Sequence, residues 1–550
     1  MDYTKYKKMY AEVPIKNRTW PDKTLTKAPA WCSVDLRDGN QALITPMGID
    51  EKLDYFQMLT DIGIKEIEVA FPAAAESEFA FVRKLIEEKL IPSDVTIQVL
   101  TQAREHIIKK TFEALKGAEN AIVHLYNSTS ELQRRVVFKK NQDETVKLAV
   151  NGAKLVKKYT KNHNGNIRLE YSPETFVGTE PEFAARICNE VLDVWQPSKD
   201  NKAIINLPST VEMSMPNVFA DQVEYMCGAI KERKNVVISV HTHNDRGCAV
   251  AASELALLAG ADRVEGTLLG NGERTGNADI MVLALNMYSH GIDPGLDFSN
   301  IENIITRYET ATHMSVPARY PYAGELVYTA FSGSHQDAIK KSTDYSKKHN
   351  LKYWENPYIP IDPTDIGRHY EPIRINSQSG SGGIAFVLQK RFGIFMPKAM
   401  ALELSEFITS VCDAKKTEVT PQFIYDTFIN NFLDICTPMR FLDYDVLAKK
   451  GETEIVTMID YKGTERKYIG SGNGPLDAFM SVLNTNFDLN LEIAGYNEHA
   501  LQHGSSSEAI AYVGVRDTEN KIYWGAGSDT NISTASIKAV VSAVNRFLQS

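Results

Sequence analysis

The sequence has no long apolar run, no recognisable leader and few cysteines. No apolar stretch approaches the ~20 residues needed to cross a bilayer, and Met1-Asp-Tyr-Thr-Lys-Tyr-Lys-Lys8 lacks the apolar region of a secretory signal peptide. The six cysteines form no C-x-x-C pair and follow no regular spacing, which predicts reduced thiols rather than a disulfide framework. We therefore expect a soluble protein of the cytoplasm that does not enter a membrane.

The sequence also lacks an excess of positive charge. Its formal net charge of −10, with no long Lys/Arg run, argues against a protein that binds the phosphate backbone of nucleic acids. There is no Walker A sequence and no G-x-G-x-x-G order after a strand, so a dinucleotide site is poorly supported. The 550 residues, 43% of them hydrophobic and 24% charged, indicate a globular enzyme of two to four domains.

Short apolar runs alternate with amphipathic segments between residues 31 and 305, after a polar, proline-containing arm at residues 1–30. The amphipathic segments, such as Glu51–Ile62 and Pro181–Trp195, have apolar residues at helical spacing. A doubly wound sheet alternates in the same way, but the number of strands and the length favour an α/β fold of the (β/α)8 TIM barrel type, which would form the catalytic domain. The strand-like runs are Trp31–Leu36, Glu66–Ala70, Val95–Leu100, Ala121–Leu125, Ile167–Tyr171, Ala203–Leu207, Val236–His241 and Arg263–Gly266.

The pattern changes twice after the barrel. Residues 306–430 combine helices, at Ser334–His349 and Pro397–Cys412, with proline-rich loops, which indicates mostly helical linker subdomains. Residues 431–550 contain two rounds of strands, a glycine-rich turn and a helix, which predicts an internally duplicated α+β domain. The strands of this domain are Glu454–Ile459, Glu465–Ile469, Ala509–Val515 and Ile522–Gly525, and its helices are Leu476–Leu483 and Ile532–Leu548.

The apolar run that starts at Val236 ends in two histidines two residues apart. Because side chains alternate faces along a strand, His241 and His243 point the same way. Two such imidazoles bind a divalent metal or form a hydrogen-bonded pair in a core. Other barrel strands also end in polar residues, and active sites of these barrels lie at that end, so we interpret the histidines as metal ligands. The other polar strand ends are Asp35–Gln41, His124–Ser128, Glu170–Glu174, Asn206–Thr210 and Glu265–Asn277.

Three further residues would complete a metal and anion site. Asp38 is the natural third ligand, although Asp-Gly is also a common turn. Arg37 beside it would face a carboxylate or a developing oxyanion, or would form an ion pair with Asp35 or Glu66. Asn277 offers an amide oxygen to the metal or an N-cap to the following helix.

Three motifs of the barrel together carry a resemblance to a known family. They are Asp35-Leu-Arg-Asp-Gly-Asn-Gln41, His241-Thr-His-Asn-Asp-Arg-Gly247 and Gly270-Asn-Gly-Glu-Arg-Thr-Gly-Asn277, followed beyond the barrel by Tyr328–Asp337, Pro357–Pro363 and Asn376–Gly380. These motifs are similar to those of the metal-dependent Claisen-condensing acyltransferases of the (β/α)8 lyase superfamily, and most of all to those of the 2-isopropylmalate synthases. Many relatives have Glu at the position of Asn40, and Asn at this position resembles the longer subgroup of the family.

The resemblance implies a reaction and a set of site residues. In this family a divalent metal polarises 2-oxoisovalerate, the enolate of acetyl-CoA attacks, and water cleaves the thioester to give 2-isopropylmalate and CoA in leucine biosynthesis. The family's metal ligands match Asp38, His241, His243 and Asn277, and Mg²⁺ is the expected ion, although Mn²⁺ or Zn²⁺ would suit the same set. The other implied residues are Arg37 as the oxyanion-stabilising group, Glu174 as a catalytic carboxylate, His124, Ser172 and Thr210 as substrate contacts, and Asn271 and Glu273, in the glycine-rich loop, as cofactor contacts.

His335 and Tyr358 lie beyond the barrel. The family places the matching His and Tyr in the active site of a neighbouring subunit, where Glu174 would orient His335 for acid–base catalysis. Without the resemblance His335 would be interpreted as an ordinary surface histidine. The resemblance therefore implies a homodimer whose monomer is not fully active.

The last domain resembles the leucine-binding regulatory domain of the same family. Because helix N-termini after glycine-rich turns can bind a carboxylate, we take Gly472, Gly474, Gly527 and Asp529 as residues near a leucine site. Feedback inhibition by leucine is then a hypothesis, and a plain dimerisation domain is the alternative.

Other functions remain open at this stage. Homocitrate, citramalate and methylthioalkylmalate synthases use the same metal and acetyl-CoA with another 2-oxo acid, but the long extension after the barrel favours isopropylmalate synthases. A C–C lyase of the HMG-CoA lyase type needs a reactive cysteine in the loop after the eighth strand, where this sequence has none. A non-catalytic metal-binding scaffold would not explain Arg37 beside Asp38.

Overall fold

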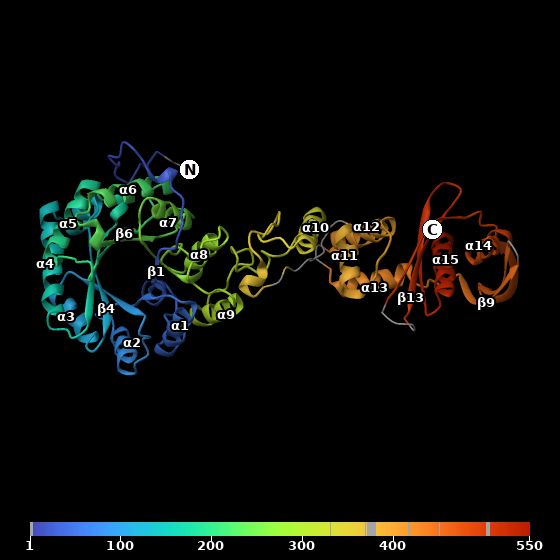
Figure 1. Ribbon diagram of the computed structural model, residues 1–550, viewed down its shortest axis with the longest axis horizontal. Helices are drawn as coiled ribbons and strands as arrows, with labels where there is room; N and C mark the ends of the chain where they lie inside the picture. The colour runs from blue at the N-terminus through green and yellow to red at the C-terminus, as the bar shows by residue number, and fades with distance from the viewer. Residues whose placement is uncertain are drawn as a thin grey trace. The chain divides into compact units, whose positions relative to one another are not determined.

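The computed structural model describes residues 4–330, 332–368, 370, 381–415, 419–449, 452–501 and 507–550. Its first part is a closed barrel of parallel strands, in which each strand pairs with the next along the chain and β8 closes on β1 (Figure 1). The predicted (β/α)8 barrel is therefore confirmed. The barrel strands are β1 (Ala30–Ser33), β2 (Glu66–Ala70), β3 (Thr96–Gln102), β4 (Asn120–Ser128), β5 (Asn166–Glu174), β6 (Ala203–Ser209), β7 (Val236–Thr242) and β8 (Arg263–Gly266).

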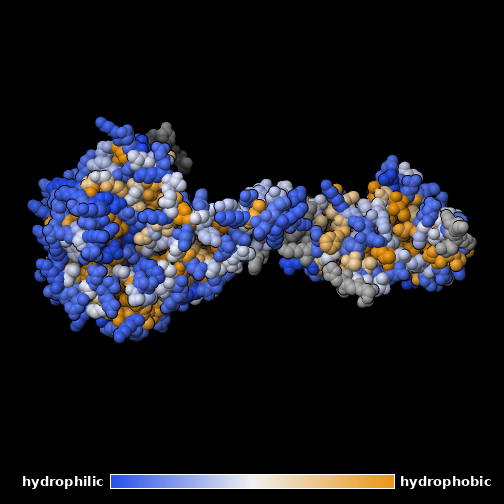
Figure 2. Space-filling view, in the orientation of Figure 1, coloured by the Kyte–Doolittle hydropathy of each residue, from blue (hydrophilic) through white to orange (hydrophobic). Residues whose placement is uncertain are grey.

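A helix follows each barrel strand. These helices are α1 (Ile49–Ile62), α2 (Glu76–Glu87), α3 (Glu105–Ala114), α4 (Gln142–Thr160), α5 (Pro181–Trp195), α6 (Pro216–Ala229), α7 (Ala249–Leu258) and α8 (Ile280–Tyr288). Pro181 and Pro216 begin their helices at a position whose N–H would have no helical partner. Gly63, with φ of 108°, ends α1 in the left-handed conformation. Figure 2 shows that hydrophilic side chains cover most of the visible outer face of the barrel, as amphipathic helices require.

The first barrel strand ends three residues earlier than predicted, at Ser33. The chain then makes one π-helical turn, Asp35–Gly39, in which the carbonyl of Val34 accepts hydrogen bonds from the backbone N–H groups of Arg37 (3.2 Å) and Asp38 (2.9 Å). Turns of this kind occur often at functional sites. This one places two neighbouring charged side chains in the mouth of the barrel.

Before the barrel, residues 4–19 form no helix or strand and cross the outside of α6. Arg18 donates two hydrogen bonds to one oxygen of Asp221, and Trp20 donates to the other oxygen at 2.9 Å. These contacts anchor the predicted N-terminal arm to the barrel. Among the described helices, none is long and apolar enough to cross a membrane.

The chain divides into two compact units, one of residues 1–327 with 361–369 and one of residues 328–360 with 370–550. The second unit begins with helices, three of which (α11 to α13) share an apolar core, so the mostly helical linker is confirmed. The domain boundaries at residues 305 and 430 stay predictions. The elements outside the barrel are α9 (Ile301–Thr312) and the 3-10 turn η7 (Pro363–Ile366) in the first unit, and α10 (Gly333–His349), α11 (Ser381–Phe392), α12 (Lys398–Lys415) and α13 (Pro421–Phe432) in the second. The motif Asn376–Gly380 lies outside the described residues.

The rest of the second unit repeats one arrangement, a three-stranded antiparallel sheet followed by a helix, which confirms the α+β class. Two of its strands, β9 and β12, are absent from the predicted set, because β12 is mostly exposed and polar and lacks a clear alternation. The elements are β9 (Met439–Lys449), β10 (Glu452–Tyr461), β11 (Thr464–Gly472) and α14 (Pro475–Phe487), then β12 (Glu492–Ala500), β13 (Ala509–Arg516), β14 (Ile522–Asp529) and α15 (Ile532–Gln549).

The prediction that Gly472 and Gly527 lie in turns before helices is wrong, because both lie in strands. A Cβ atom added at Gly472 would lie 2.5 Å from the backbone nitrogen of Ala478 in α14. One added at Gly527 would lie 2.3 Å from the carbonyl oxygen of Ala535 in α15. These glycines let a strand pack directly against the helix that follows it.

Candidate active site and metal centre

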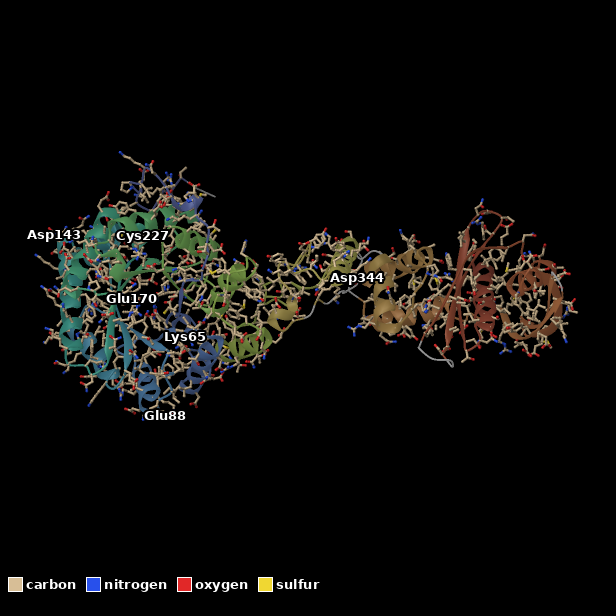
Figure 3. The ribbon with its side chains drawn as sticks, viewed as in Figure 1. Lys65, Glu88, Asp143, Glu170, Cys227 and Asp344 are labelled. Atoms are coloured by element: carbon tan, nitrogen blue, oxygen red, sulfur yellow. The ribbon has the colours of Figure 1, made fainter. Side chains whose placement is uncertain are left out.

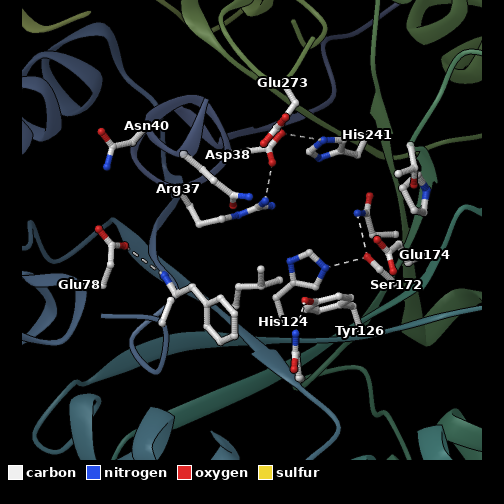
Figure 4. A pocket seen from close by; sticks show the side chains of 18 of the residues that line it. Arg37, Asp38, Asn40, Glu78, His124, Tyr126, Ser172, Glu174, His241 and Glu273 are labelled. Atoms are coloured by element: carbon white, nitrogen blue, oxygen red, sulfur yellow. Dashed lines mark hydrogen bonds and ion pairs between the residues drawn. The ribbon is translucent and has the colours of Figure 1, made fainter. Parts of the chain in front are cut away.

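A cavity of about 800 Å³ opens at the carboxyl ends of the barrel strands (Figure 4). Its walls combine polar side chains from the strand ends and from the loops after β1, β2 and β8 with apolar ones such as Phe71, Ala74 and Leu100. Side chains far apart in the sequence meet there in one site. The expected site residues that line it are Arg37, Asp38, His124, Ser172, Glu174, Thr210, His241, His243 and Glu273.

Asp38, His241 and His243 converge at one side of the cavity. One ligand atom from each lies within 4.8 Å of the others, and all three side chains are buried. Nε2 of His241 is 3.5 Å, and Nε2 of His243 3.8 Å, from the same oxygen of Asp38. The ring centroids of the two histidines are 5.2 Å apart. Two imidazoles and one carboxylate at this spacing form half of the coordination shell of a divalent cation.

Asn277 lies beside this cluster and supplies the test of whether a cation fits. Its backbone pairs with that of His243 in an isolated antiparallel bridge, and its Nδ2 donates to Asp38 Oδ2 at 3.0 Å. Its Oδ1 and the Nδ1 of His243 are buried and have no hydrogen-bond partner among the described residues. Such orphaned polar atoms are rare, and here both adjoin the cluster, so the donor set fits a metal ion. The alternative that Asn277 caps the next helix is wrong, because Asp279 accepts those N–H groups.

Arg37 is held by two carboxylates. Its Nη1 donates to Asp38 at 2.6 Å, and its Nε forms a short hydrogen bond to Glu68. The alternative prediction, that Arg37 forms an ion pair with Asp35 or Glu66, is wrong. Asp35 accepts a hydrogen bond from Tyr55, and Glu66 pairs with arginines at the other end of the barrel. Burial would raise the pKa of Asp38, but Arg37, His241 and His243 together outweigh burial and hold this pKa well below its usual range. The aspartate is thus an anion ready for a cation.

The two histidines differ in their surroundings. Burial lowers the pKa of His241, but hydrogen bonds to Asp38 and Glu265 outweigh burial and raise it to about 9. For His243, burial and then the charge of His241 lower the pKa to about 4. His243 is therefore neutral at pH 7 and keeps a lone pair for a metal.

The opposite wall of the cavity contains His124 between two polar partners. Its Nδ1 lies 2.6 Å from Glu68. Its Nε2 lies 2.7 Å from Ser172 Oγ, a contact marked by a dashed line in Figure 4. Asn206 donates to the same hydroxyl at 3.0 Å. Because Glu68 binds both Arg37 and His124, one buried carboxylate connects the two walls of the site.

Glu174 and Thr210 complete the mouth of the cavity. A carboxylate oxygen of Glu174 accepts a short hydrogen bond from Ser128 at the end of β4. The hydroxyl of Thr210 accepts from the backbone N–H of Thr175 at 2.9 Å, and its carbonyl accepts from Arg274 at 2.6 Å. Both side chains line the cavity.

The loop after β8 folds back tightly on the turn that carries Asp38. Gly276, with φ of 96°, approaches Gly270 so closely that a Cβ atom would collide with its carbonyl oxygen. Asn271 is buried and donates to the carbonyl of Gly39 at 3.1 Å, whereas Glu273 lines the cavity. The cofactor contacts expected of Asn271 and Glu273 stay predictions.

His335 and Tyr358 both lie in the second compact unit, and the described cavity belongs to the first. Their rings stack at a centroid distance of 4.0 Å, and both side chains are exposed. A stacked, exposed His–Tyr pair is available for contact with another surface. Near the C-terminus, Asp529 pairs with Lys538 at 2.8 Å, and Gly474 has open space around its Cα.

Buried charges beneath the cavity were not given roles by the sequence reasoning. Glu68, Glu170, Arg263 and Glu265 point into the barrel and are fully buried; Figure 3 shows Glu170 inside the barrel, with Asp143 and Glu88 on its outside. Arg263 Nη1 lies 2.9 Å from Glu265 and 3.3 Å from Glu170. The signal in the sequence was a charged residue at alternate positions of an otherwise apolar strand, as in Arg263-Val-Glu265.

Comparisons with known proteins match the whole length of the chain. Three family models match in order: HMGL-like over residues 28–306, alpha-isopropylmalate synthase post-catalytic domain-like over 325–389, and LeuA allosteric (dimerisation) domain over 418–548. Similar proteins named 2-isopropylmalate synthase include one from Clostridium acetobutylicum, 55% identical over 99% of both chains. Others are from Acetoanaerobium sticklandii, 51% identical over 100% of this chain and 97% of that one, and from Helicobacter hepaticus, 51% identical over 100% of both.

Proposed function

The chain belongs to the 2-isopropylmalate synthase family, and from this premise we propose how its own residues carry out the reaction. The activity is that of an acetyl-CoA-dependent acyltransferase of leucine biosynthesis: condensation of acetyl-CoA with 2-oxoisovalerate, then hydrolysis of the thioester. One observation carries the assignment of roles. Asp38, His241 and His243 converge in a single cavity beside Arg37, whose guanidinium pairs with Asp38 and Glu68.

The family depends on a divalent metal, and Asp38, His241, His243 and Asn277 would hold it here. We propose Mg²⁺. When bound, the ion acts as a Lewis acid on the carbonyl of the 2-oxo acid. Arg37 remains cationic, because the charges of Glu68 and Asp38 overcome its burial and raise its pKa further. Its guanidinium then stabilises negative charge that develops on oxygen beside the metal site.

The remaining roles follow from position. Thr210 at the mouth would bind the substrate carboxylate through its hydroxyl, and His124 and Ser172 would form the wall that packs against the substrate. Glu174 would orient an acid–base group, for which the exposed His335 and Tyr358 of a second subunit are the candidates. This arrangement requires a homodimer. Figure 2 shows orange patches on the C-terminal unit. Exposed large hydrophobic residues of this unit support such an assembly; they include Ile469, Ile493, Tyr496, Ile522 and Ile532.

The first experiment measures release of CoA with a thiol reagent. Acetyl-CoA and Mg²⁺ are held constant, and pyruvate, 2-oxobutyrate, 2-oxoisovalerate and 2-oxoglutarate are compared, each with and without leucine. We expect a preference for 2-oxoisovalerate, loss of activity in His243→Ala, and inhibition by leucine through the C-terminal domain. A preference for another 2-oxo acid would contradict the proposal that 2-oxoisovalerate is the substrate. Full activity in saturating leucine would contradict the proposed feedback inhibition.

The shared active site has a separate test. Glu174→Ala and His335→Ala are each expected to be inactive alone. If the site combines residues of two subunits, equal mixing after dissociation gives one intact site in each mixed dimer, about a quarter of wild-type activity by chance association. No recovery in dimers shown to have exchanged subunits would contradict the arrangement. The free thiols of all six cysteines support the further proposal that the enzyme works in the reducing cytoplasm.

A further inference from the structure

The carboxylate of Glu265 has four hydrogen-bonding partners inside the barrel. It lies on β8, is fully buried, and is outside the lining of the cavity. Oε1 accepts from Arg263 Nη1 at 2.9 Å and from Gln98 Nε2 at 3.0 Å. Oε2 accepts from Asn206 Nδ2 at 3.0 Å and lies 2.9 Å from Nδ1 of His241.

These contacts determine where the proton of His241 lies. Arginine and amide N–H groups can only donate, so both oxygens of Glu265 act as acceptors. Nδ1 of His241 must therefore carry hydrogen and donate to Oε2. In the neutral form of the ring, which is the form that binds a metal, the lone pair is then on Nε2, the atom that faces Asp38 at 3.5 Å. Nothing comparable holds His243, whose Nδ1 has no hydrogen-bond partner in the described part of the chain.

The same carboxylate also reaches the substrate wall. Asn206, which donates to Glu265, donates with the same nitrogen to Ser172 Oγ at 3.0 Å. Ser172 in turn lies 2.7 Å from Nε2 of His124. Glu265 thus contacts the candidate metal ligand His241 on β7 directly, and through Asn206 it is joined to Ser172 in the wall formed by β4 and β5.

We propose that Glu265 is a positioning residue, which holds His241 in the tautomer that presents Nε2 to a divalent cation and, through Asn206, aligns the substrate wall with that cation. This inference rests on the proposed metal-dependent function and adds to it a residue that touches neither metal nor substrate. A carboxylate behind a ligating histidine fixes the ring and raises its basicity, and its loss commonly weakens metal binding or activity about 10–100-fold.

The variant to test is Glu265→Gln. All four partners of the carboxylate are donors, so whichever way the amide turns, its NH2 group faces donors and leaves them unpaired. The matched control is Glu66→Gln, at the other end of the barrel. Glu66 is also a carboxylate paired with Arg263, and with Arg168 at 2.7 Å, but it has no contact with a candidate metal ligand.

The measurement is binding of Mn²⁺ to the full-length protein without substrates, by titration calorimetry and by the EPR signal of free Mn²⁺. We expect Glu265→Gln to bind roughly 10–100-fold more weakly than wild type and Glu66→Gln to bind like wild type. Equal affinity of Glu265→Gln and wild type, or equal weakening in both variants, would overturn the inference. Absence of Mn²⁺ binding by wild type would instead refute the metal site of the proposed function.

Folding of each variant is checked by circular dichroism before binding is measured. If Glu265→Gln does not fold because Arg263 is left with an uncompensated charge, the double variant Arg263→Gln/Glu265→Gln removes both charges of the pair. Weak Mn²⁺ binding by the folded double variant, beside normal binding by Arg263→Gln, supports the positioning role. Normal binding by the double variant overturns it.

Discussion

Replacing Glu170 by glutamine would show whether the buried side chain of Glu170 is a neutral acid or an ionised carboxylate. Glu170 is fully buried, neither of its oxygens accepts a hydrogen bond from a described donor, and one lies within 4.8 Å of an oxygen of Glu265. Burial, and then the charge of Glu265, raise the pKa of Glu170 well above its usual value. Glu170 therefore keeps its proton at pH values where a free glutamate is ionised, and glutamine has nearly the shape of the protonated side chain.

The size and sign of the effect follow from proton linkage. In the unfolded chain a glutamate loses its proton near pH ~4.3. Above that pH and below the native pKa, the native state binds one proton more than the unfolded state, so this group lowers the free energy of unfolding by about 1.4 kcal/mol per pH unit as pH rises. Glutamine has no such dependence. The stability of Glu170→Gln relative to wild type should therefore rise by about 1.4 kcal/mol for each pH unit between the unfolded and the native pKa of Glu170.

The assay is urea denaturation at pH 5, 6 and 7, followed by far-UV circular dichroism. The control is Glu68→Gln, because Glu68 is equally buried but is held ionised by Arg37 and His124, with its pKa lowered. Removing that charge should cost about 3–5 kcal/mol at pH 7, since its partners lose their counter-ion. A loss in Glu170→Gln as large as in Glu68→Gln at pH 7, or a difference from wild type that does not change with pH, would refute the assignment of a proton to Glu170.

Three further predictions concern other parts of the protein. Gly527→Ala should lower the free energy of unfolding of the C-terminal domain by about 1–3 kcal/mol, because its Cβ would meet α15, whereas Gly474→Ala, with open space around it, should unfold like wild type in the same urea titration. Arg37→Lys should lower kcat for CoA release about 10²–10³-fold, since an ammonium cannot bridge Glu68 and Asp38 as the guanidinium fork does; an unchanged kcat would exclude the oxyanion role. Chelation of divalent metal should lower the unfolding temperature measured by scanning calorimetry, and added Mg²⁺ should restore it in wild type but not in His243→Ala. The same response in both proteins would place the stabilising ion at another site.

Much of the fold and of the candidate site was predictable from local chemistry. The alternation of apolar runs with amphipathic segments predicts a parallel sheet covered by helices, and the number of strands favours a closed barrel over a doubly wound sheet. The period of two in a strand brings His241 and His243 to one face, and the barrel brings strand ends together, so Asp38 and Thr210 could be expected in the same cavity. Strands β9 and β12 were missed because an exposed strand loses the apolar alternation that reveals it.

What only the tertiary structure decided is which partner each side chain takes. The π-helical turn after β1 turns Arg37 toward Glu68 rather than Asp35 or Glu66, and no local pattern encodes that choice. Glycine is required at Gly472 of β11 and Gly527 of β14 because the following helix packs too close for a Cβ atom, and this distance depends on tertiary packing. The proton on Glu170 and the tautomer of His241 depend on side chains of β3, β5, β6, β7 and β8 meeting inside a closed barrel, since burial and neighbouring charges exist only once the chain has folded. Sequence determines which chemical groups reach the barrel mouth; the folded barrel determines their charge and orientation.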